Sequence, residues 1–323
     1  MHSINQLQAL INLAIADLKY PASPKELYEP ISYLMDLGGK RMRPVSLLMA
    51  CSLFDDDISR AIKPALAIEV FHNFTLMHDD IMDNAPLRRG KPTVQQKWNN
   101  SVAILSGDVM LVEAYKLIME VDAGILPDVL RIFNETAVGV CEGQQIDMNF
   151  EGLDHVTETD YLNMIRLKTA VLLGAALKIG SLVGGASLAD AELLYKFGVN
   201  MGIAFQLQDD ILDVYGNPEK FGKQVGGDII ANKKTYLLIK AVELADHAAA
   251  SDLNKWLASS NDPLQKVQVV TEIYDQLNVR QLAENEMEKY AKNALSNLDQ
   301  VCVADEKKDT LRNFAESLLV REH

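Results

Sequence analysis

The chain has 323 residues and a formal net charge of −14 at pH 7. Such an acidic chain disfavours nonspecific nucleic-acid binding, so any anionic ligand would need local basic residues. Proline, glycine and aromatic residues are sparse while Leu, Ala and Met are plentiful, which favours an all-helical protein. The length is high for one domain but is compatible with a single large one.

Helical periodicity recurs along most of the chain. Near the N-terminus, apolar residues stand at positions 4, 7, 11, 15 and 18, which is the spacing of an amphipathic helix. This stretch lacks the basic start and continuous apolar core of a signal peptide. Further helices are expected at residues 45–54, 60–82, 102–119, 128–148, 160–180, 190–213, 234–247, 264–297 and 308–320.

Turn-forming residues separate these helices. Residues 21–24 read Pro-Ala-Ser-Pro, residues 84–99 form a basic and polar connection, and Gly216-Asn217-Pro218 opens a loop towards Lys234. None of these segments resembles a flexible linker between domains. We therefore expect one all-α domain, residues 1–323, in which large helices surround a central apolar cavity.

Two further features bear on location. The most apolar stretch, residues 170–189, is interrupted by Lys178 and by glycines, so we interpret it as a buried helix rather than a membrane span. The cysteines Cys51, Cys141 and Cys302 are far apart in the sequence. This spacing is typical of reduced thiols in a cytosolic protein and not of a zinc or disulfide framework.

The most informative pattern is a short acidic motif that occurs twice, as Asp79-Asp80-Ile81-Met82-Asp83 and as Asp209-Asp210-Ile211-Leu212-Asp213. Residues i and i+4 share one face of a helix, so the first and last aspartates of each motif point together. A single copy is more often a solvated helix face or an N-terminal turn favoured by the helix dipole. Two near-identical copies, each after a mostly apolar segment, indicate a site for a hard cation. Mg²⁺ suits such a site because it is held by one or two carboxylates, waters and phosphate oxygens.

Four basic clusters stand out against the acidic background. The segment Gly38-Gly39-Lys40-Arg41-Met42-Arg43-Pro44 places three cations beside a glycine pair, where an anion can approach the backbone closely. Arg88-Arg89-Gly90-Lys91 follows the first aspartate motif, and Gly222-Lys223 with Lys233-Lys234 follows the second. Arg166-Leu167-Lys168-Thr169 lies in an otherwise apolar helix, where its charges either extend to solvent or face a polar cavity. Each cluster taken alone is compatible with ordinary solvated residues.

The order of the clusters indicates a common ligand, because each acidic motif is followed by a basic loop. This arrangement suits a ligand with several phosphate oxygens, which Arg and Lys hold through charge-assisted hydrogen bonds while metal ions neutralise the aspartates. No Gly-x-x-x-x-Gly-Lys-Ser/Thr phosphate loop is present, and an all-helical chain offers no strand to carry one. The pattern therefore argues against a nucleoside triphosphatase.

The ordered set of motifs resembles the trans-polyprenyl diphosphate synthase family, of the short-chain farnesyl or geranylgeranyl diphosphate synthase type. The resemblance covers nearly the whole chain. It implies the all-α isoprenoid synthase fold, a homodimer, a cytoplasmic location and dependence on Mg²⁺, with three ions in each active site once substrate is bound. The matching positions are residues 38–44, His72, residues 79–83, Arg88-Arg89-Gly90, Lys168-Thr169, Phe205-Gln206, residues 209–213, Gly222-Lys223 and Lys233.

The resemblance also implies a role for each matching residue. The metal ions would bind to the carboxylates of Asp79, Asp83 and Asp209. The allylic diphosphate would lie between the two aspartate motifs, held by the cations Arg88, Lys168, Lys223 and Lys233. Isopentenyl diphosphate would be held by Lys40, Arg43, His72 and Arg89. The carbocation left by ionisation would be stabilised by the Lys168 carbonyl and by the side chains of Thr169 and Gln206. By themselves, His72 is more often a satisfied core histidine and Gln206 a buried polar contact.

The implied reaction is a Mg²⁺-dependent head-to-tail condensation of isopentenyl diphosphate with an allylic diphosphate. Product length is expected to depend on Phe71, Phe74 and Thr75, although phenylalanines at such positions are more often core residues. Thr75 is small, where farnesyl-producing animal-type relatives tend to carry a second aromatic residue. The first aspartate motif also lacks the two-residue insertion of many bacterial farnesyl synthases. We therefore expect the twenty-carbon geranylgeranyl product, with the fifteen-carbon farnesyl product as the alternative.

Three other functions fit these motifs less well. A class I terpene cyclase of the same fold would usually replace the second aspartate motif and lack the Gly-Gly-Lys-Arg segment. A di-iron helical bundle would need a second Glu-x-x-His besides Glu69-Val70-Phe71-His72, and the sequence has none. A non-enzymatic regulatory subunit of a prenyl synthase would have lost aspartates or basic residues that are all intact here.

Overall fold

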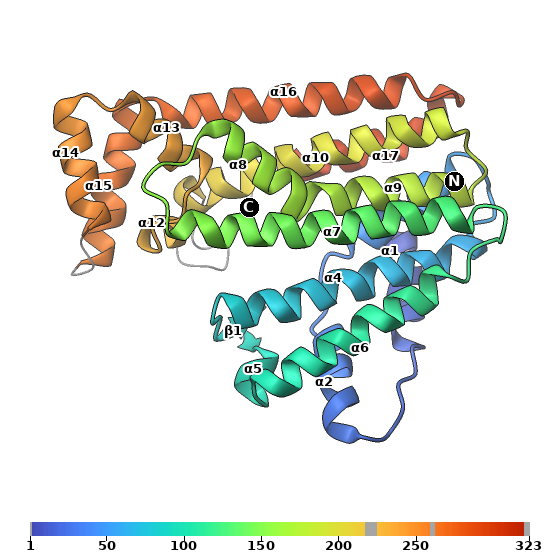
Figure 1. The fold of residues 1–323 in the computed structure, drawn as a ribbon. Coiled ribbons are helices and arrows are strands. Elements are labelled where there is room, and N and C mark those ends of the chain that lie inside the picture. Colours follow the sequence, from blue (N-terminus) through green and yellow to red (C-terminus); the bar gives the residue numbers. More distant parts are fainter. Residues whose placement is uncertain (1, 217–224, 259–261, 320–323) are drawn as a thin grey trace. The chain divides into compact units, whose positions relative to one another are not determined.

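The computed structural model describes residues 2–216, 225–258 and 262–319. The chain divides into two compact units. Unit 1 comprises residues 1–136, 172–195 and 299–311, and unit 2 comprises residues 137–171, 196–298 and 312–323. The helices labelled α7, α9, α10, α16 and α17 in Figure 1 each contribute residues to both units, although α16 gives only Asp299 to unit 1. The expectation of a single domain stays a prediction.

Unit 1 contains the N-terminal helices and the first aspartate motif. Its core surrounds α4, which packs most extensively against α6 and is buried along most of its length. Such burial explains why this helix is mostly apolar before the aspartates begin. Its elements are α1 (Ile4–Ala16), α2 (Lys25–Asp36), α3 (Met42–Ser52), η1 (Ser59–Ala61), α4 (Ile62–Met82), β1 (Leu87–Arg88), β2 (Lys91–Pro92), α5 (Val94–Lys97), α6 (Asn100–Ile118), the first part of α7 (Leu126–Glu151), all but the first residue of α9 (Val171–Val183), and the starts of α10 (Leu188–Tyr215) and α17 (Asp305–Leu319).

Unit 2 contains the second aspartate motif. One apolar cluster forms its core, with residues from α8, α10, α13, α15 and α16. Its elements are the rest of α7, α8 (Glu158–Ile165), the π-helical turn η2 (Arg166–Ala170), the larger part of α10, α12 (Gly227–Ile230), α13 (Tyr236–Leu244), α14 (His247–Leu257), α15 (Pro263–Gln276) and α16 (Val279–Asp299), followed by the end of α17.

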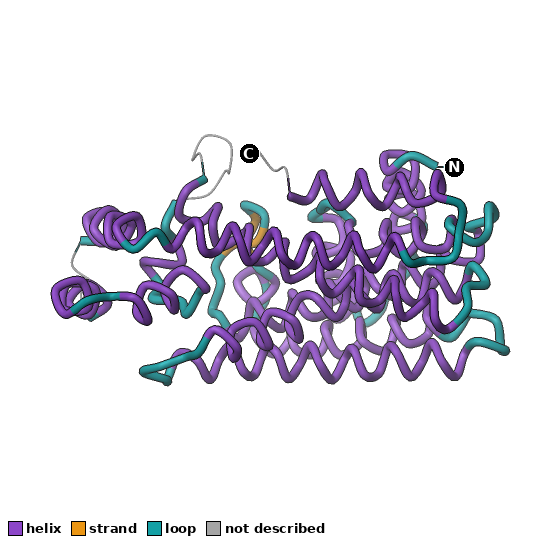
Figure 2. Tube along the Cα trace, turned by 90° about the horizontal axis from the view of Figure 1, so that it is seen from above, coloured by secondary structure: helices purple, strands orange, loops and turns teal. Residues whose placement is uncertain are grey.

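The predicted all-α class is confirmed. Within the described part of the chain, the strands are limited to the two-residue pair β1 and β2, which is orange in Figure 2. This pair forms a hairpin in which Arg88 is opposite Lys91, and the connecting Arg89 and Gly90 both have positive φ, at 53° and 74°. Positive φ at both positions is typical of the tight turn that matches strand twist. The basic segment after the first aspartate motif is therefore an ordered hairpin.

The helices α2, α5 and α14 were not predicted, and the prediction is wrong in three further places. The helix expected at residues 160–180 contains the π-helical turn η2, so one extra residue is accommodated at Lys168. The helix expected at 264–297 is two helices, because Asn278 has a left-handed φ of 55°, which ends α15. The loop expected between Gly216 and Lys234 contains the short helix α12.

Two expectations from the sequence can be compared with the structure directly. None of the described helices is long and apolar enough to cross a membrane. Cys51, Cys141 and Cys302 are all free thiols, as their spacing predicted.

Candidate active site

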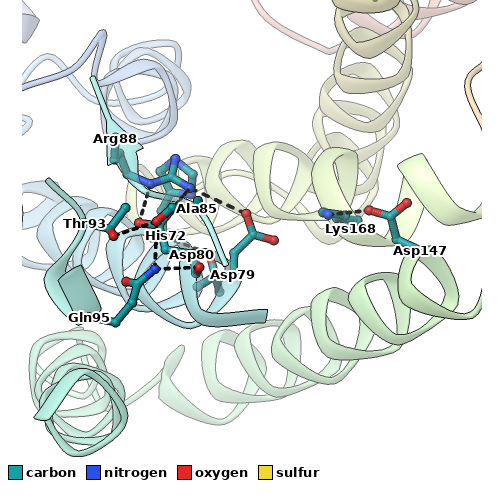
Figure 3. Close-up of polar contacts among 10 residues, drawn as sticks. His72, Asp79, Asp80, Ala85, Arg88, Thr93, Gln95, Asp147 and Lys168 are labelled. Carbon is teal, nitrogen blue, oxygen red and sulfur yellow. Dashed lines mark hydrogen bonds and ion pairs between the residues drawn. The ribbon is translucent and has the colours of Figure 1, made fainter. Parts of the chain in front are cut away.

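The first aspartate motif occupies the C-terminal end of α4. Asp79 is partly exposed and Asp83, the residue that caps the helix, is exposed, whereas Asp80 is only 2% exposed. The i and i+4 carboxylates therefore lie towards solvent, while the middle one turns inward. Asp80 accepts two hydrogen bonds from Arg88, of 2.8 Å from Nε and 2.7 Å from Nη2 (Figure 3). Burial raises the pKa of Asp80, and this bidentate pair opposes the rise.

Backbone carbonyls at the end of α4 anchor the hairpin that carries Arg88. The Gln95 amide donates to the carbonyl oxygens of Asp80 and Ala85, at 2.7 Å and 2.9 Å. The Thr93 hydroxyl donates to the same Ala85 carbonyl at 2.7 Å (Figure 3). These bonds tie the residues after the hairpin to the turn that follows α4, where the Asp80 carbonyl also accepts from the N–H of Ala85 at 2.9 Å. They also hold Arg88 beside Asp79, whose carboxylate lies 3.6 Å from its Nη2.

His72 and Arg43 meet across α3 and α4. The Nη1 atom of Arg43 lies 3.2 Å from Nε2 of His72. An arginine side chain can only donate, so Nε2 must accept and the proton of the neutral ring is on Nδ1. Burial and the nearby charges of Arg43, Arg89, Arg88 and Arg41 hold the pKa of His72 well below its ordinary value. The structure thus brings together four of the residues that the sequence analysis proposed for the site: His72, Arg43, Arg88 and Arg89.

The glycine pair before α3 brings Arg89 to the same place. Gly39 has a φ of 139°, and a Cβ atom there would lie 2.8 to 2.9 Å from the guanidinium atoms of Arg89. A residue with a side chain would therefore displace Arg89. Lys40 follows directly and is exposed. Arg43, His72 and Arg89 therefore lie near one another in unit 1, beside the segment that carries Lys40.

Arg41 differs from its neighbours, because it is buried and holds the fold. Its Nη1 atom lies 2.5 Å from Oε1 of Glu69, and Nη2 donates to the Met35 carbonyl at 2.8 Å. The Asn73 amide donates to the same Glu69 oxygen at 3.1 Å. Glu69 is therefore occupied by structural contacts, which removes the one Glu-x-x-His as a di-iron ligand.

The residues expected to limit product length lie in an aromatic cluster of unit 1. The Phe71 ring is 5.6 Å from Phe74 and 5.2 Å from Phe133, and Phe74 is 4.8 Å from the His78 ring. Phe71 is 1% exposed and Phe74 is 9% exposed. The hydroxyl of Thr75 donates to the His72 carbonyl at 2.7 Å, so it is turned back onto its own helix. Phe71 thus has the surroundings of a core residue, and the role of Phe71, Phe74 and Thr75 in limiting product length stays a prediction.

In unit 2, Lys168 and Thr169 lie within the π-helical turn η2. The Lys168 ammonium donates to Asp147 of α7 at 2.6 Å (Figure 3). The Thr169 hydroxyl lies 3.4 Å from the side-chain oxygen of Gln206 on α10. The turn packs closely on α7, because a Cβ atom at Gly143 would lie 2.7 Å from the Cα atom of Lys168. Three residues predicted from different parts of the sequence are therefore neighbours.

The second aspartate motif repeats the pattern of the first. Asp210 is 3% exposed and accepts from the Tyr161 hydroxyl, while Asp209 and Asp213 are partly exposed. Burial, followed by repulsion from Asp228, raises the pKa of Asp210 to about 7. Asp213 accepts from the backbone N–H of Asp228 at 2.9 Å. In both motifs, then, the middle carboxylate is buried and accepts hydrogen bonds from another element, the hairpin in unit 1 and α8 in unit 2.

The remaining predicted cation positions are less defined. Lys233 is exposed and lies 4.0 Å from Asp228, whereas Lys223 is outside the described residues. Sequence reasoning missed Asp147, Tyr161 and Asp228, which contact the expected site residues. Asp147 lies 21 residues before Lys168 on a different helix, so no local spacing indicates their contact.

The donor atoms suit a hard cation, although neither motif alone makes a complete cage. No cluster of three or more His, Cys, Asp or Glu side chains in the described ranges has metal-binding geometry. Each motif instead offers its two outer carboxylates from one helix face. One or two carboxylates per ion, with waters and phosphate oxygens, are the usual ligands of Mg²⁺.

Comparison with known proteins identifies the family. Residues 24–277 match the polyprenyl synthetase family. The chain is 41% identical to a geranylgeranyl diphosphate synthase of Methanosarcina mazei over 72% of each chain. It is 39% identical to one of Sulfolobus acidocaldarius, over 85% of this chain and 84% of that protein. A crystal structure of a geranylgeranyl pyrophosphate synthase superposes with a TM-score of 0.95 and 41% identity over the whole of both chains. The expected isoprenoid synthase fold is thereby confirmed, and the chain belongs to the polyprenyl synthetase family and is a prenyltransferase.

Proposed function

We propose that this prenyltransferase condenses isopentenyl diphosphate with an allylic diphosphate, head to tail, and that its product is a short trans-polyprenyl diphosphate. Geranylgeranyl diphosphate is the favoured product, and farnesyl diphosphate is the alternative. The observation that carries the proposal is the repeated geometry of the aspartate motifs, each with a buried middle carboxylate and two outer ones. The names of the similar proteins support the choice of substrate class and of the twenty-carbon product.

Asp79 and Asp83 of unit 1 and Asp209 of unit 2 would hold Mg²⁺, with three ions bound in the presence of substrate. The bound metal would supply positive charge against the negative charge that grows on the departing diphosphate. Asp80 and Asp210 would not bind metal directly, because they are engaged by Arg88 and Tyr161. Their role is to orient the helix ends that present the outer carboxylates.

Basic side chains of each unit would bind the two diphosphates. For the allylic diphosphate, Arg88 keeps donors beyond its bidentate pair with Asp80. Lys168, which is partly buried beside Asp147, would add a second cation. Lys223 and Lys233 would complete this set. Isopentenyl diphosphate would be held by Lys40, Arg43, His72 and Arg89. The neutral His72 would donate its Nδ1 proton, since Nε2 accepts from Arg43.

The chemistry after ionisation would depend on oxygen atoms of unit 2. Lys168 lies in the π-helical turn η2, and its carbonyl oxygen would stabilise the electron-poor carbon. The Thr169 hydroxyl and the Gln206 side-chain oxygen are 3.4 Å apart and can stabilise the same cation. The double bond of isopentenyl diphosphate would then attack the allylic carbon, and the adduct would lose a proton to the released diphosphate, which restores a double bond.

We further propose that the protein is a cytoplasmic homodimer. Large apolar side chains are exposed at three positions of α6 and at the residue that caps its C-terminal end, and a second copy of the chain would cover them: Ile104, Leu105, Val112 and Met119. Exposed apolar residues on one helix are typical of a protein–protein interface. Light scattering of the purified protein would test this, because a monomeric mass at micromolar concentration would contradict it.

The test of the reaction is product analysis of the purified chain. It should be incubated with isopentenyl diphosphate and, separately, dimethylallyl, geranyl or farnesyl diphosphate, with and without Mg²⁺. Geranylgeranyl diphosphate should accumulate only with the metal. Undiminished turnover in excess chelator would contradict the metal dependence, and release of a cyclic hydrocarbon would identify a cyclase instead.

A further inference from the structure

The segment between Gly226 and Lys233 connects the second aspartate motif to a proposed diphosphate-binding cation. Its start is held by Asp213, the last residue of the motif. The N–H of Gly226 donates to the Asp213 carbonyl at 2.6 Å, and the N–H of Asp228 donates to its carboxylate at 2.9 Å. The end of the segment is the turn at Asn232, which has a left-handed φ of 55° and directly precedes Lys233.

A buried lysine of α15 holds that end. Lys266 is 3% exposed, and its Nζ atom lies 2.6 Å from the side-chain oxygen of Asn232 and 3.2 Å from the Ile230 carbonyl. Asn232 is held a second time, because its amide donates to the Leu257 carbonyl at 3.0 Å. The ammonium thus connects α15 to both the last residue of α12 and the turn that follows.

The next residue of α15, Val267, supports the start of the segment. Gly226 has a φ of 81°, and a Cβ atom there would lie 2.6 Å from the γ-carbons of Val267. The neighbouring residues Lys266 and Val267 therefore contact the two ends of one short segment.

A buried lysine at this position costs desolvation free energy. Both of its acceptors are neutral oxygens, and removing an ammonium from water costs more free energy than hydrogen bonds to neutral groups readily return. Burial accordingly lowers the pKa of Lys266. An apolar side chain of similar length would fill the space without that cost. The ammonium is therefore better explained by what it positions than by its contribution to overall stability.

We propose that Lys266 is a positioning residue that fixes the segment 226–233 against α15 and so holds Lys233 in place for the allylic diphosphate. That Lys233 binds the allylic diphosphate rests on the proposed function, whereas the contact of Lys266 with the segment does not. Lys233 is exposed and has a long flexible side chain. A fixed backbone beneath it limits the conformations that must be lost when diphosphate binds.

The test compares Lys266→Met and Lys266→Arg with a matched control. Lys308 is also a buried lysine, at 4% exposure, and donates to the Asp299 carbonyl at 2.7 Å, outside this segment. Lys308→Met therefore removes a buried ammonium without touching the segment. Hydrogen exchange of the backbone amides in residues 226–235 is measured first, on the full chain without substrate. We expect about tenfold or faster exchange there in Lys266→Met, the factor for losing a hydrogen bond to a charged group, and no such change in Lys308→Met.

Kinetics then test the consequence for binding. Lys266→Met should raise KM for the allylic diphosphate by about tenfold or more and leave KM for isopentenyl diphosphate unchanged, and Lys266→Arg should recover part of the loss. Unchanged exchange in residues 226–235 would overturn the inference, as would faster exchange with an unaltered allylic KM. If Lys266→Met fails to fold, Asn232→Gly removes the acceptor while tolerating the left-handed turn, and the same outcomes apply.

The exchange and kinetic measurements together distinguish a failure of this inference from a failure of the proposed function. A wild-type protein that transfers no prenyl group would contradict the proposed function. The exchange measurement would still decide whether Lys266 holds the segment. Conversely, an active enzyme whose segment is insensitive to Lys266→Met would refute only the positioning role.

Discussion

Replacing Gly143 by Ala should impair prenyl transfer far more than the size of one methyl group suggests. Gly143 lies where α7 meets the π-helical turn, and the added Cβ atom would be 2.7 Å from the Cα of Lys168 and 2.8 Å from the Leu167 carbonyl carbon. Carbon atoms in ordinary contact are about 3.5–4.0 Å apart. All of the nearest atoms belong to the backbone, so no side chain can rotate away. The turn must therefore move by roughly 1 Å, taking Lys168 and Thr169 with it.

The expected magnitude follows from that displacement. A misplacement of about 1 Å in groups that position substrate can lower the rate by about 10²-fold. Overfilling a packed interior costs about 1–3 kcal/mol of stability, against which the higher helix propensity of Ala returns about 1 kcal/mol. Gly143→Ala should therefore remain folded while its kcat falls by about two orders of magnitude.

Gly139 provides a matched control one turn earlier on α7. A Cβ atom at Gly139 would meet the nearest side-chain carbons of Leu167 and Val171 at 3.4 Å and 3.8 Å, which are ordinary contacts. Gly139→Ala should keep wild-type activity and gain a little stability from helix propensity. Steady-state turnover with farnesyl and isopentenyl diphosphates, with circular dichroism as a check of folding, compares the two variants. Equal activity of Gly143→Ala and Gly139→Ala would refute the reasoning.

Three further predictions test other parts of the site. Asp79→Ala and Asp209→Ala should each lower turnover by more than the roughly 10²–10³-fold typical of one lost electrostatic contact, measured at saturating Mg²⁺; near-normal rates in either variant would contradict its role. Phe74→Ala, and more so its combination with Phe71→Ala, should give products longer than geranylgeranyl diphosphate, because a ring that blocks the growing chain is removed; an unchanged product profile in the double variant would place the length limit elsewhere. The pKa of His72 is lowered in the folded protein, so below the unfolded value of about 6.5 the unfolded chain binds a proton that the folded chain excludes. The free energy of unfolding therefore decreases as the pH is lowered, by up to about 1.4 kcal/mol per pH unit. Urea unfolding of His72→Asn and wild type between pH 7.5 and 5.5 should show a weaker pH dependence in the variant, and identical slopes would contradict this assignment.

The sequence by itself determined the helical class and the composition of the site. Apolar spacing predicted most helices, since the periodicity of 3.6 residues is a local property of the chain. The spacing within each aspartate motif likewise predicted that Asp79 and Asp83 share a helix face, and both are indeed more exposed than Asp80. Helix ends were less predictable. The turn at Asn278 depends on a single left-handed residue that the surrounding pattern does not signal.

Only the tertiary structure decided which charged residues support the fold and which are available to a ligand. Arg41 and Arg43 are two positions apart, yet the first is buried against Glu69 and the second meets His72. The contacts of Lys168 with Asp147 and of Lys266 with Asn232 join residues 21 and 34 positions apart. Such pairs depend on how separate helices pack, and packing is set by the shapes of many side chains at once rather than by any local spacing. For that reason the sequence could name the cations of the site but not the partners that orient them.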